Sequence, residues 1–411
     1  MIFLVDGSCR LTGSSSLFEL KIERIVHRGF GLARKEGKVV FVPNVLPGER
    51  VVCQIEQERG SWVYARPVKI IEKSPFRIEP ACKYYPQCGG CQFAHIEYSH
   101  QLEVKQQALI ETFARISNIE ISQKIKKIIP APEPWRYRIR IRLHCSPQKG
   151  VGFQAPLGAG LVVIDDCLLA KEELGSAIKS LPSLIRSLKW EKEKAIELDI
   201  ETHTGKINAV LSAKMIFAYH NGDFITSSPT KKEWLRLLSF VQPNPEQNQK
   251  LKQTLKSLVK ETKAKNCLEL FAGWGNFSFE LAELVENLVC VELNPYAVEL
   301  ARIYQKELKA SNIRFIQSPC EKYLESVIKR QKEFDLVILD PPRSGARKES
   351  ALLTQLLPQH IIYISCEPTT LARDLKILAD FYELKKIILL DMFPQTFHIE
   401  SISLLKRKVK A

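Results

Sequence analysis

The 411-residue sequence has no apolar run long enough to cross a lipid bilayer, which excludes membrane-spanning helices. Its opening residues, MIFLVDGSCR, form only a short apolar patch with no basic residue before it, and this pattern does not match a secretory signal. The eleven cysteines are odd in number and irregularly spaced, which argues against the disulfide framework of a secreted protein. We therefore expect a cytoplasmic protein with no membrane partner and no evident obligate protein partner.

Acidic residues are also in short supply. The sequence contains 46 Asp and Glu against 60 Lys and Arg, so its formal net charge is +14. An excess of this size suits a polyanionic partner, because basic side chains gain affinity by releasing counterions from phosphates. A basic surface with no nucleic-acid partner is the alternative, and composition alone does not separate the two.

Changes in sequence pattern divide the chain into four segments. We expect a flexible tail at residues 1–16 and a small β-barrel at residues 17–79, where short strand patterns are separated by glycine and proline. Residues 80–241 begin with a cysteine cluster and continue in mixed strands and helices. Residues 242–411 alternate strands with helices, which predicts a doubly wound, mainly parallel sheet and an α/β fold class.

The stretch WRYRIRIRLH alternates strictly between basic and apolar residues. A strand here would place four arginines on one face: Arg136, Arg138, Arg140 and Arg142. Such a face is suited to following a phosphate backbone, which we favour because of the net charge. The alternative is a solvated outer face with no RNA contact.

The stretch LELFAGWGNFSFELA predicts a glycine-rich turn between a strand and a helix. Gly273 and Gly275 allow the backbone to pass close to a ligand. The next strand ends at Glu292, whose carboxylate can accept hydrogen bonds from a ribose diol. A glycine turn alone is weak evidence, but the two features together favour an adenosine-containing cofactor.

The stretch FDLVILDPPRSG ends a strand at Asp340, and two prolines stiffen the chain after it. A terminal acid followed by two prolines resembles the substrate-facing motif of methyltransferases. In enzymes that methylate the amino group of adenine, an aromatic residue follows the prolines and stacks on the base. Arg343 occupies that position here, which argues against methylation of amino groups.

The stretch YISCEPTTLARDL places Cys366 between a buried strand and a helix, where a thiol tends to have a lowered pKa. Carbon 5 of uridine becomes nucleophilic when a thiolate adds to carbon 6. A base must then remove the proton on carbon 5, and DMFPQTFHIESISLL offers His398 and Glu400 for that step. The alternative for Cys366 is a buried structural thiol.

These residues resemble the RNA uridine-5 methyltransferases with a TRAM domain and a [4Fe–4S] cluster, typified by the bacterial 23S ribosomal RNA enzymes. The resemblance extends from about Leu17 to Leu405 and is most specific in SCEPTTLARD and DMFPQTFHIE. It implies that Cys366 is the nucleophile, that Glu400 accepts the proton and that S-adenosyl-L-methionine is the cofactor. The implied cofactor-binding residues are Gln242, Phe271, Asn276, Glu292 and Asp340.

The same resemblance completes the expected fold and substrate. The first segment is similar to a TRAM barrel, an OB-like fold, through HRGFGLAR and FVPNVLPGE. The resemblance thus implies a Rossmann-like methyltransferase domain preceded by this barrel and a mixed α+β iron–sulfur domain. Related enzymes that act on transfer RNA typically lack the barrel and the cluster, so 23S rRNA is the expected substrate. The alternatives are a transfer RNA uridine-5 methyltransferase and a non-catalytic RNA-binding assembly protein.

The stretch CKYYPQCGGC brings three cysteines into ten residues: Cys82, Cys88 and Cys91. Three thiols at this spacing are suited to one soft metal centre, and the spacing alone does not separate zinc from iron–sulfur. The resemblance implies a [4Fe–4S] cluster with Cys167 as the fourth ligand, and Cys145 is the alternative fourth ligand.

Overall fold

The computed structural model describes residues 17–146, 148–187, 196–203, 206–211, 215–226 and 229–409. The expected tail at residues 1–16 lies outside these ranges. The chain divides into two compact units, one that runs to Ala108 and includes Gln395–Phe397, and one formed by Leu109–Pro394 and the residues from His398 onward. Among the residues described, no helix combines the length and the apolar character needed to span a bilayer.

The first unit contains a six-stranded sheet in the order β1-β5-β6-β4-β3-β2. Its elements are β1 (Leu17–Lys21), β2 (Arg24–Val26), η1 (His27–Gly29), β3 (Phe30–Lys35), β4 (Lys38–Val42), β5 (Arg50–Arg59) and β6 (Trp62–Glu72). Alternate residues of these strands, such as Val40, Val42, Val51 and Cys53, form its buried core. The predicted β-barrel is confirmed as a barrel-like sheet. Helix α1 (Tyr98–Ile116) contains the boundary between the units.

The second unit contains two sheets. The first has seven strands in the order β10-β9-β8-β11-β12-β13-β14, and every pairing in it is antiparallel. Its strands are β8 (Arg140–Ser146), β9 (Gly150–Gln154), β10 (Leu161–Val163), β11 (Ile196–His203), β12 (Lys206–Leu211), β13 (Met215–His220) and β14 (Asp223–Thr226). The associated helices are η3 (Pro156–Gly158), α2 (Glu172–Ser187) and α3 (Lys231–Leu237).

The prediction that four arginines share one strand face is wrong. Strand β8 begins only at Arg140, and Arg136 has a positive φ of 53°, which interrupts the extended backbone. Arg136 instead donates hydrogen bonds of 2.9 and 2.7 Å to Asp166. Arg142 donates two bonds of 2.9 Å to Asp199 on the neighbouring strand. These guanidinium groups are therefore paired with carboxylates of the same unit.

The remaining sheet has eight strands in the order β17-β16-β15-β18-β19-β21-β20-β7. They are β7 (Ile125–Ile129), β15 (Asn266–Leu270), β16 (Asn287–Glu292), β17 (Ile313–Gln317), β18 (Leu336–Leu339), β19 (His360–Ser365), β20 (Tyr382–Leu390) and β21 (Glu400–Arg407). The first five in the sheet order are parallel, whereas β21 is antiparallel to β19 and β20. The predicted doubly wound, mainly parallel sheet is confirmed.

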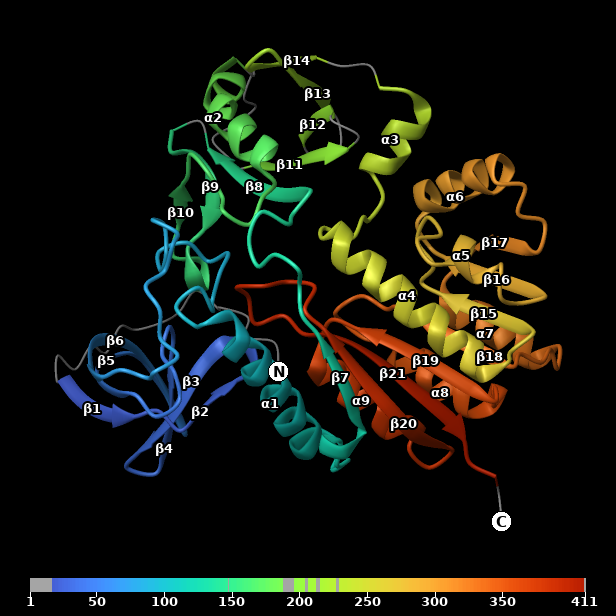
Figure 1. The fold of residues 1–411 in the computed structure, drawn as a ribbon, viewed down its shortest axis with the longest axis horizontal. Helices are drawn as coiled ribbons and strands as arrows, with labels where there is room; N and C mark the ends of the chain where they lie inside the picture. Colours follow the sequence, from blue (N-terminus) through green and yellow to red (C-terminus); the bar gives the residue numbers. More distant parts are fainter. Residues whose placement is uncertain are drawn as a thin grey trace. The chain divides into compact units, whose positions relative to one another are not determined.

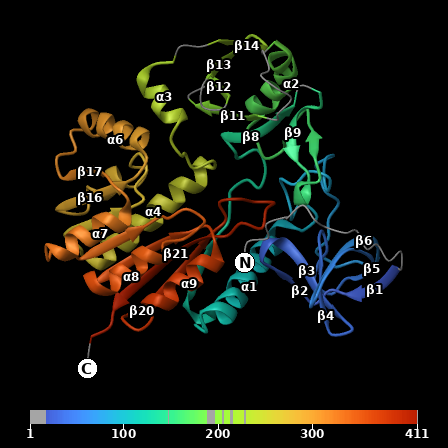
Figure 2. The ribbon, with the colours of Figure 1, turned by 180° about the vertical axis from the view of Figure 1, so that it is seen from behind.

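Helices cover this sheet because its parallel strands are buried on both faces. They are η2 (Ser122–Lys124), α4 (Pro245–Thr262), α5 (Ser278–Leu281), α6 (Pro295–Glu307), α7 (Cys320–Lys329), α8 (Arg347–Leu356) and α9 (Pro368–Leu378). Figure 1 shows α4 in front of the sheet, and the reverse view in Figure 2 brings α8 and α9 to the front. Strand β7, which lies in the segment expected to form the central domain, pairs with β20 at the sheet edge.

Candidate active site

The candidate site residues converge on one edge of the eight-stranded sheet. Strands β15, β16, β18 and β19 are parallel, so their carboxyl ends share that edge. Phe271 follows β15, Glu292 ends β16, Asp340 follows β18 and Cys366 follows β19. Glu400 begins β21 at the same edge, because β21 runs in the opposite direction. Ligands of doubly wound sheets bind at this edge.

The glycine turn is tied to the end of the next strand. The amide of Gly273 donates a 2.9 Å hydrogen bond to Glu292, whose other carboxylate oxygen accepts from the amide of Asn294 at 2.7 Å. Gly273 has a φ of +57°, and a Cβ at this position would have no atom within 4 Å, so the backbone there borders open space. At Gly275 (φ +91°) a Cβ would lie 2.6 Å from the ring of Phe279. The positive φ favours glycine at both positions, and at Gly275 the ring of Phe279 also leaves no room for a Cβ.

Of the other expected cofactor-binding residues, Phe271 and Asn276 flank this turn, and Gln242 lies before α4. Phe271 is half-buried and has a positive φ of 61°, a conformation that is uncommon for a bulky residue. The side-chain amides of Asn276 and Asn248 exchange two hydrogen bonds of 3.0 and 2.9 Å, which connect the turn to α4. Gln242 is half-buried three residues before α4 begins at Pro245.

The register of β19 and β21 brings Cys366 and Glu400 together. Ser365 pairs with Ser401 in these antiparallel strands, so the residue after Ser365 lies opposite the residue before Ser401. Cys366 is half-buried, and the side chain of Glu400 is only 3% exposed. The structure thus juxtaposes the two residues that are 34 positions apart in the chain.

The expected lowering of the Cys366 pKa is wrong for this structure. Burial, and then the neighbouring carboxylates of Glu400 and Asp340, raise the pKa of the thiol to about 12, while Arg343 acts in the opposite direction. The thiol was expected to be stabilised as a thiolate by the amino end of α9, but a carboxylate occupies that end of the helix. Glu367 is the N-cap residue, and its carboxylate accepts from the backbone of the first turn.

The two acids beside Cys366 also have raised pKa values. Burial, and then the charge of Asp340, hold the pKa of Glu400 well above its usual range, while Arg343 lowers it. Burial raises the pKa of Asp340 to about 7. His398 lies against Arg343, with 3.0 Å between its Nε2 and a guanidinium nitrogen. Acids with perturbed pKa values at a ligand-binding edge are suited to proton transfer.

Sequence reasoning missed a further buried acid. Glu269 lies inside β15, is 2% exposed and accepts a 2.6 Å hydrogen bond from the hydroxyl of Ser278. Burial is the main cause that raises the pKa of Glu269 to about 7; the hydrogen bond from Ser278 acts in the opposite direction, and the charges of Asp340 and Glu292 contribute to the increase. The only sequence signal is a single acid within the otherwise apolar strand NCLEL.

The segment that leads to Glu400 is held by side chains from two other parts of its unit. The amide of Asn244, the N-cap residue of α4, donates to the carbonyl of Met392 at 3.3 Å. The buried amide of Gln247 donates to the carbonyl of Asp391 at 2.8 Å. The hydroxyl of Tyr137 donates to the carbonyl of Pro394 at 3.0 Å. These bonds connect backbone carbonyls before Glu400 to α4 and to the chain before β8.

The clustered cysteines lie in the first unit and are half-buried: Cys82, Cys88 and Cys91. The amide of Gly90 donates to the sulfur of Cys88 at 3.4 Å. Cys167, in the second unit, is also half-buried, whereas Cys145 is fully buried in β8 and burial raises its pKa to about 12. Across the described ranges the structure contains no group of three or more His, Cys, Asp or Glu side chains positioned to hold a metal ion.

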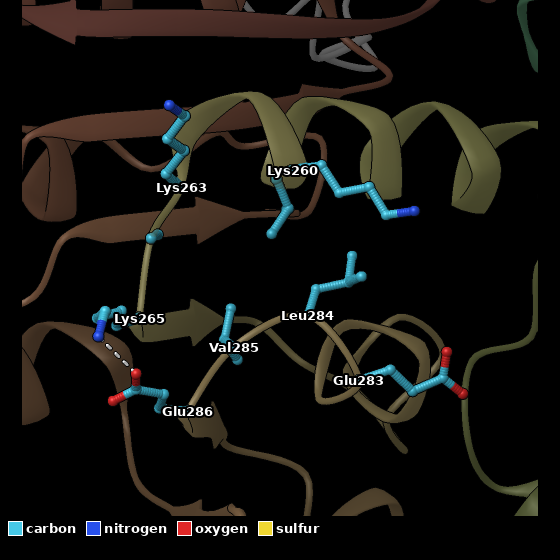
Figure 3. Close-up of a pocket in the computed structure, with 9 residues that line it drawn as sticks. Lys260, Lys263, Lys265, Glu283, Leu284, Val285 and Glu286 are labelled. Atoms are coloured by element: carbon cyan, nitrogen blue, oxygen red, sulfur yellow. Dashed lines mark ion pairs between the residues drawn. The ribbon is translucent and has the colours of Figure 1, made fainter.

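A hollow of about 460 Å³ lies at the opposite edge of the sheet (Figure 3). Lys265, which precedes β15, and Glu286, which precedes β16, line it and form an ion pair of 2.7 Å. These residues mark the amino ends of strands whose carboxyl ends carry the glycine turn and Glu292. The hollow is therefore separate from the candidate site.

Comparison with known proteins agrees with this geometry. Residues 235–408 match the tRNA (Uracil-5-)-methyltransferase family, and residues 16–68 match the TRAM domain. An RNA methyltransferase of Aquifex aeolicus is 32% identical, with 95% of this chain and 98% of that protein covered. The 23S rRNA (uracil(1939)-C(5))-methyltransferase of Shewanella woodyi is 31% identical, with 95% and 96% covered.

A solved structure shares the fold. The tRNA (uracil-54, C5)-methyltransferase of Pyrococcus abyssi, crystallised with S-adenosyl-L-homocysteine, is similar with a TM-score of 0.68 and 24% identity. The comparison covers 94% of this chain and all of that one. With the site at the carboxyl edge of the sheet and relatives above 30% identity over nearly their full length, the chain belongs to the family of S-adenosylmethionine-dependent RNA uracil-5-methyltransferases.

Proposed function

We propose that this protein methylates carbon 5 of a specific uridine in 23S ribosomal RNA through a covalent adduct with Cys366. The observation that carries the proposal is the juxtaposition of Cys366 and Glu400 by the register of β19 and β21. A nucleophile beside a buried acid is the combination that addition to carbon 6 and proton removal from carbon 5 require.

The residues at the carboxyl edge fit S-adenosyl-L-methionine. We assign its binding to Gln242, Phe271, Asn276, Glu292 and Asp340. The open space beside Gly273, together with the hydrogen bond that holds Glu292 next to it, supports this assignment. When bound, this cofactor supplies an electrophilic methyl group.

In the reaction, the Cys366 thiol gives up its proton to solvent, and the resulting thiolate sulfur forms a bond to carbon 6 of uracil. The electron pair of the carbon 5–carbon 6 double bond then moves to make carbon 5 nucleophilic. Arg343 favours this step, because it opposes the burial that keeps the thiol protonated. After carbon 5 has gained the methyl group, Glu400 accepts the proton from carbon 5. The bond between carbon 6 and sulfur then breaks, which restores the double bond and the Cys366 thiolate.

Glu400 is suited to that proton transfer because its pKa is raised by burial and by Asp340. A carboxylate with a raised pKa binds a proton more strongly, so its ionised form is a stronger base. His398 is the alternative base. Its Nε2 lies 3.0 Å from the Arg343 guanidinium, a cationic neighbour that makes it less suited to gain a proton.

The RNA substrate is proposed from three features together. The net charge of +14 suits a polyanion, the first unit matches the TRAM domain, and relatives such as the Shewanella woodyi enzyme carry names that specify 23S rRNA. Such a substrate also supports a cytoplasmic location. Mass mapping of RNA from a strain without the gene should reveal one uridine of 23S rRNA that has lost its methyl group. Loss in transfer RNA would instead support a transfer RNA enzyme, and no loss would support a non-catalytic assembly protein.

We also propose that Cys82, Cys88, Cys91 and Cys167 bind a [4Fe–4S] cluster that organises an iron–sulfur domain within residues 80–241. Half-buried thiols in a glycine-containing loop, with an amide donating to the sulfur of Cys88, have the donor chemistry of such a ligand set. Cys145 is less suited, because burial in β8 favours its neutral thiol.

Metal analysis of anaerobically purified protein tests this assignment. The full-length protein should be brown, contain four irons and lose its colour on oxidation. Replacing any one of the four cysteines with serine should lower the iron content, weaken RNA binding and reduce methyl transfer only indirectly. One equivalent of zinc without iron or sulfide would contradict the cluster and leave the methyltransferase assignment intact.

A further inference from the structure

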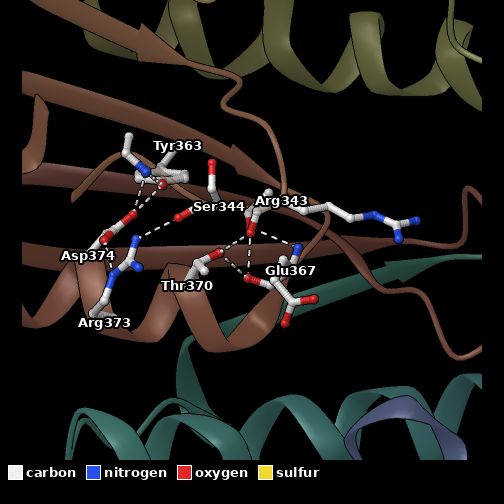
Figure 4. Close-up of polar contacts among 9 residues, drawn as sticks. Arg343, Ser344, Tyr363, Glu367, Thr370, Arg373 and Asp374 are labelled. Atoms are coloured by element: carbon white, nitrogen blue, oxygen red, sulfur yellow. Dashed lines mark hydrogen bonds and ion pairs between the residues drawn. The ribbon is translucent and has the colours of Figure 1, made fainter. Parts of the chain in front are cut away.

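The loop between β18 and α8, residues 340–346, is bonded to one face of α9 (Figure 4). Three α9 side chains make these bonds: Thr370, Arg373 and Asp374. Their spacing of three and four residues places them on the same side of the helix. Thr370 donates to the carbonyl of Arg343 at 3.2 Å, and Arg373 donates to the carbonyl of Ser344 at 2.9 Å.

Asp374 is the centre of this arrangement. It is fully buried, and its carboxylate accepts from the amide of Ala346 at 2.7 Å, from the hydroxyl of Tyr363 at 2.7 Å and from Nε of Arg373 at 2.8 Å. The Tyr363 oxygen also accepts from the amide of Ala346 at 3.1 Å. A buried carboxylate is costly unless it is paired and hydrogen-bonded, so these donors determine where the loop can lie.

The contact between loop and helix leaves no room for a larger residue. Gly345 has a φ of +75°, and a Cβ there would lie 2.6 Å from both Arg373 Nη2 and Asp374 Oδ2 and 2.8 Å from the Cβ of Thr370. Its backbone conformation also favours glycine. The loop is therefore held at van der Waals contact as well as by hydrogen bonds.

The two elements joined in this way carry different parts of the proposed site. The loop carries Arg343, whose side chain extends away from Asp374 in Figure 4 and reaches His398 at 3.0 Å. Helix α9 starts at Pro368, two residues after Cys366. The hydroxyl of Ser365 accepts from the amide of Glu367, which closes the turn that contains Cys366. The distance between the Arg343 charge and the Cys366 sulfur thus depends on the contact of the loop with α9.

We propose that Tyr363, Thr370, Arg373 and Asp374, here named the loop clamp, are positioning residues that hold Arg343 at the distance from Cys366 and Glu400 that the reaction requires. This inference rests on the proposed function, because it assigns a role in the same reaction. Misplacement of a charged group by about 1 Å is enough to cost on the order of 100-fold in rate. The loop clamp therefore acts on turnover through Arg343.

Two variants and a matched control test the proposal with the full-length protein. Tyr363→Phe removes one hydroxyl from the loop clamp, and Thr370→Val removes the bond to the Arg343 carbonyl. Tyr382→Phe is the control, since Tyr382 is equally buried on β20 and its hydroxyl donates to the carbonyl of Pro358 at 2.9 Å, outside the loop clamp. Methyl transfer is measured with ribosomal RNA from a strain without the gene, together with the KM for S-adenosylmethionine and the thermal midpoint.

Both loop clamp variants should lower kcat by about 10- to 100-fold with little change in KM for the cofactor. Tyr382→Phe should keep kcat within about twofold of wild type even if its thermal midpoint falls as far as that of Tyr363→Phe. An equal loss of kcat in all three variants would overturn the proposal. So would an unchanged kcat in both loop clamp variants.

Hydrogen exchange separates failure of this inference from failure of the proposed function, because it needs no RNA. The amide of Ala346 should exchange faster in Tyr363→Phe and remain unchanged in Tyr382→Phe. Unchanged exchange in Tyr363→Phe would overturn the loop clamp even where the wild-type protein methylates uridine. Faster exchange in Tyr363→Phe, combined with a wild-type protein that leaves uridine unmethylated, would support the contact while contradicting the assigned reaction.

Discussion

Two groups of buried charges in the second unit behave in opposite ways. Near β8, the carboxylate of Glu201 is 2% exposed and forms ion pairs with both Arg140 and Arg236. At the carboxyl edge of the other sheet, Glu400 is 3% exposed and lies beside a second acid, Asp340, and a thiol. The pKa of Glu400 is strongly raised, although Arg343 acts in the opposite direction.

The difference shows which charges are suited to chemistry. A buried carboxylate between two guanidinium groups has its charge compensated, so it contributes to structure and is poorly suited to exchange a proton. A buried carboxylate next to another acid has a raised pKa, because burial and the neighbouring negative charge both disfavour its ionised form, and acids perturbed in this way are suited to proton transfer. The arginine-rich stretch is the more prominent feature of the sequence, yet the less conspicuous acids mark the proposed reaction centre.

The largest effect is expected for Cys366→Ala, which should abolish methyl transfer while cofactor affinity stays near that of wild type. The reason is that no other group described at this edge supplies a sulfur nucleophile opposite Glu400. Methyl transfer to RNA and cofactor binding by calorimetry measure the two quantities. Cys267→Ala is the matched control, since Cys267 is buried in the core of β15, and it should remain active. Near wild-type turnover by Cys366→Ala would contradict a covalent mechanism.

The next largest effect is expected for Glu400→Gln. Turnover should fall by about 100- to 10,000-fold, because the amide is unable to accept the proton from carbon 5. Glu383→Gln, at an exposed position of β20, should leave turnover unchanged. Steady-state methyl transfer checks both variants. If Glu400→Gln retains normal turnover, His398 or a water molecule becomes the better assignment for the base.

On the other side of the comparison, Glu201→Gln should reduce stability and leave the reaction unchanged. Removing this carboxylate leaves two buried guanidinium groups without their partner, which costs about 3–5 kcal/mol in the free energy of unfolding. Urea denaturation measures the loss, and kcat is compared at a temperature where the variant is folded. A tenfold loss of kcat in the folded variant would show that this charge group also serves catalysis.

A smaller effect of opposite sign is expected for Asp340→Asn. The pKa of Asp340 is about 7 in the folded protein against an ordinary value of 3.8, so ionisation costs folding stability as pH rises through this interval. Asparagine has no such cost. At pH 8 the variant should therefore be more stable than wild type by up to about 4 kcal/mol, with little difference near pH 4, while methyl transfer falls. Equal stability at both pH values would contradict the raised pKa.

The sequence was sufficient for the features that local patterns determine. Alternating strands and helices predicted the parallel sheet, and short glycine-separated strands predicted the barrel-like one. The arginine strand was mispredicted because its alternation says nothing of Asp166 and Asp199, which lie 30 and 57 residues from their partners. The segment boundaries at residues 79 and 241 stay a prediction, and the pairing of β7 with β20 shows that strands from two of those segments share one sheet.

The sequence identified candidate residues that the structure brings to one edge of the sheet, but it did not indicate their electrostatics. The motif around Cys366 predicted the thiol and the helix that follows it, but the pKa of the thiol depends first on its own burial and then on the charges of Glu400 and Asp340 beside it. That proximity arises from the register of β19 and β21, which no local pattern encodes. Glu269 was missed for a similar reason, because an acid within an apolar strand is read as part of the core until its neighbours are known.

The central claim is that Cys366 forms the covalent bond to uracil and Glu400 allows its release. The most direct test uses the Glu400→Gln protein with S-adenosylmethionine and ribosomal RNA from a strain without the gene. After digestion by protease and nuclease, mass spectrometry of the peptide that contains Cys366 should show an attached, methylated uridine nucleotide. A Cys366 peptide without any nucleotide, or a nucleotide attached to a different cysteine, in a sample that has methylated RNA would contradict the account.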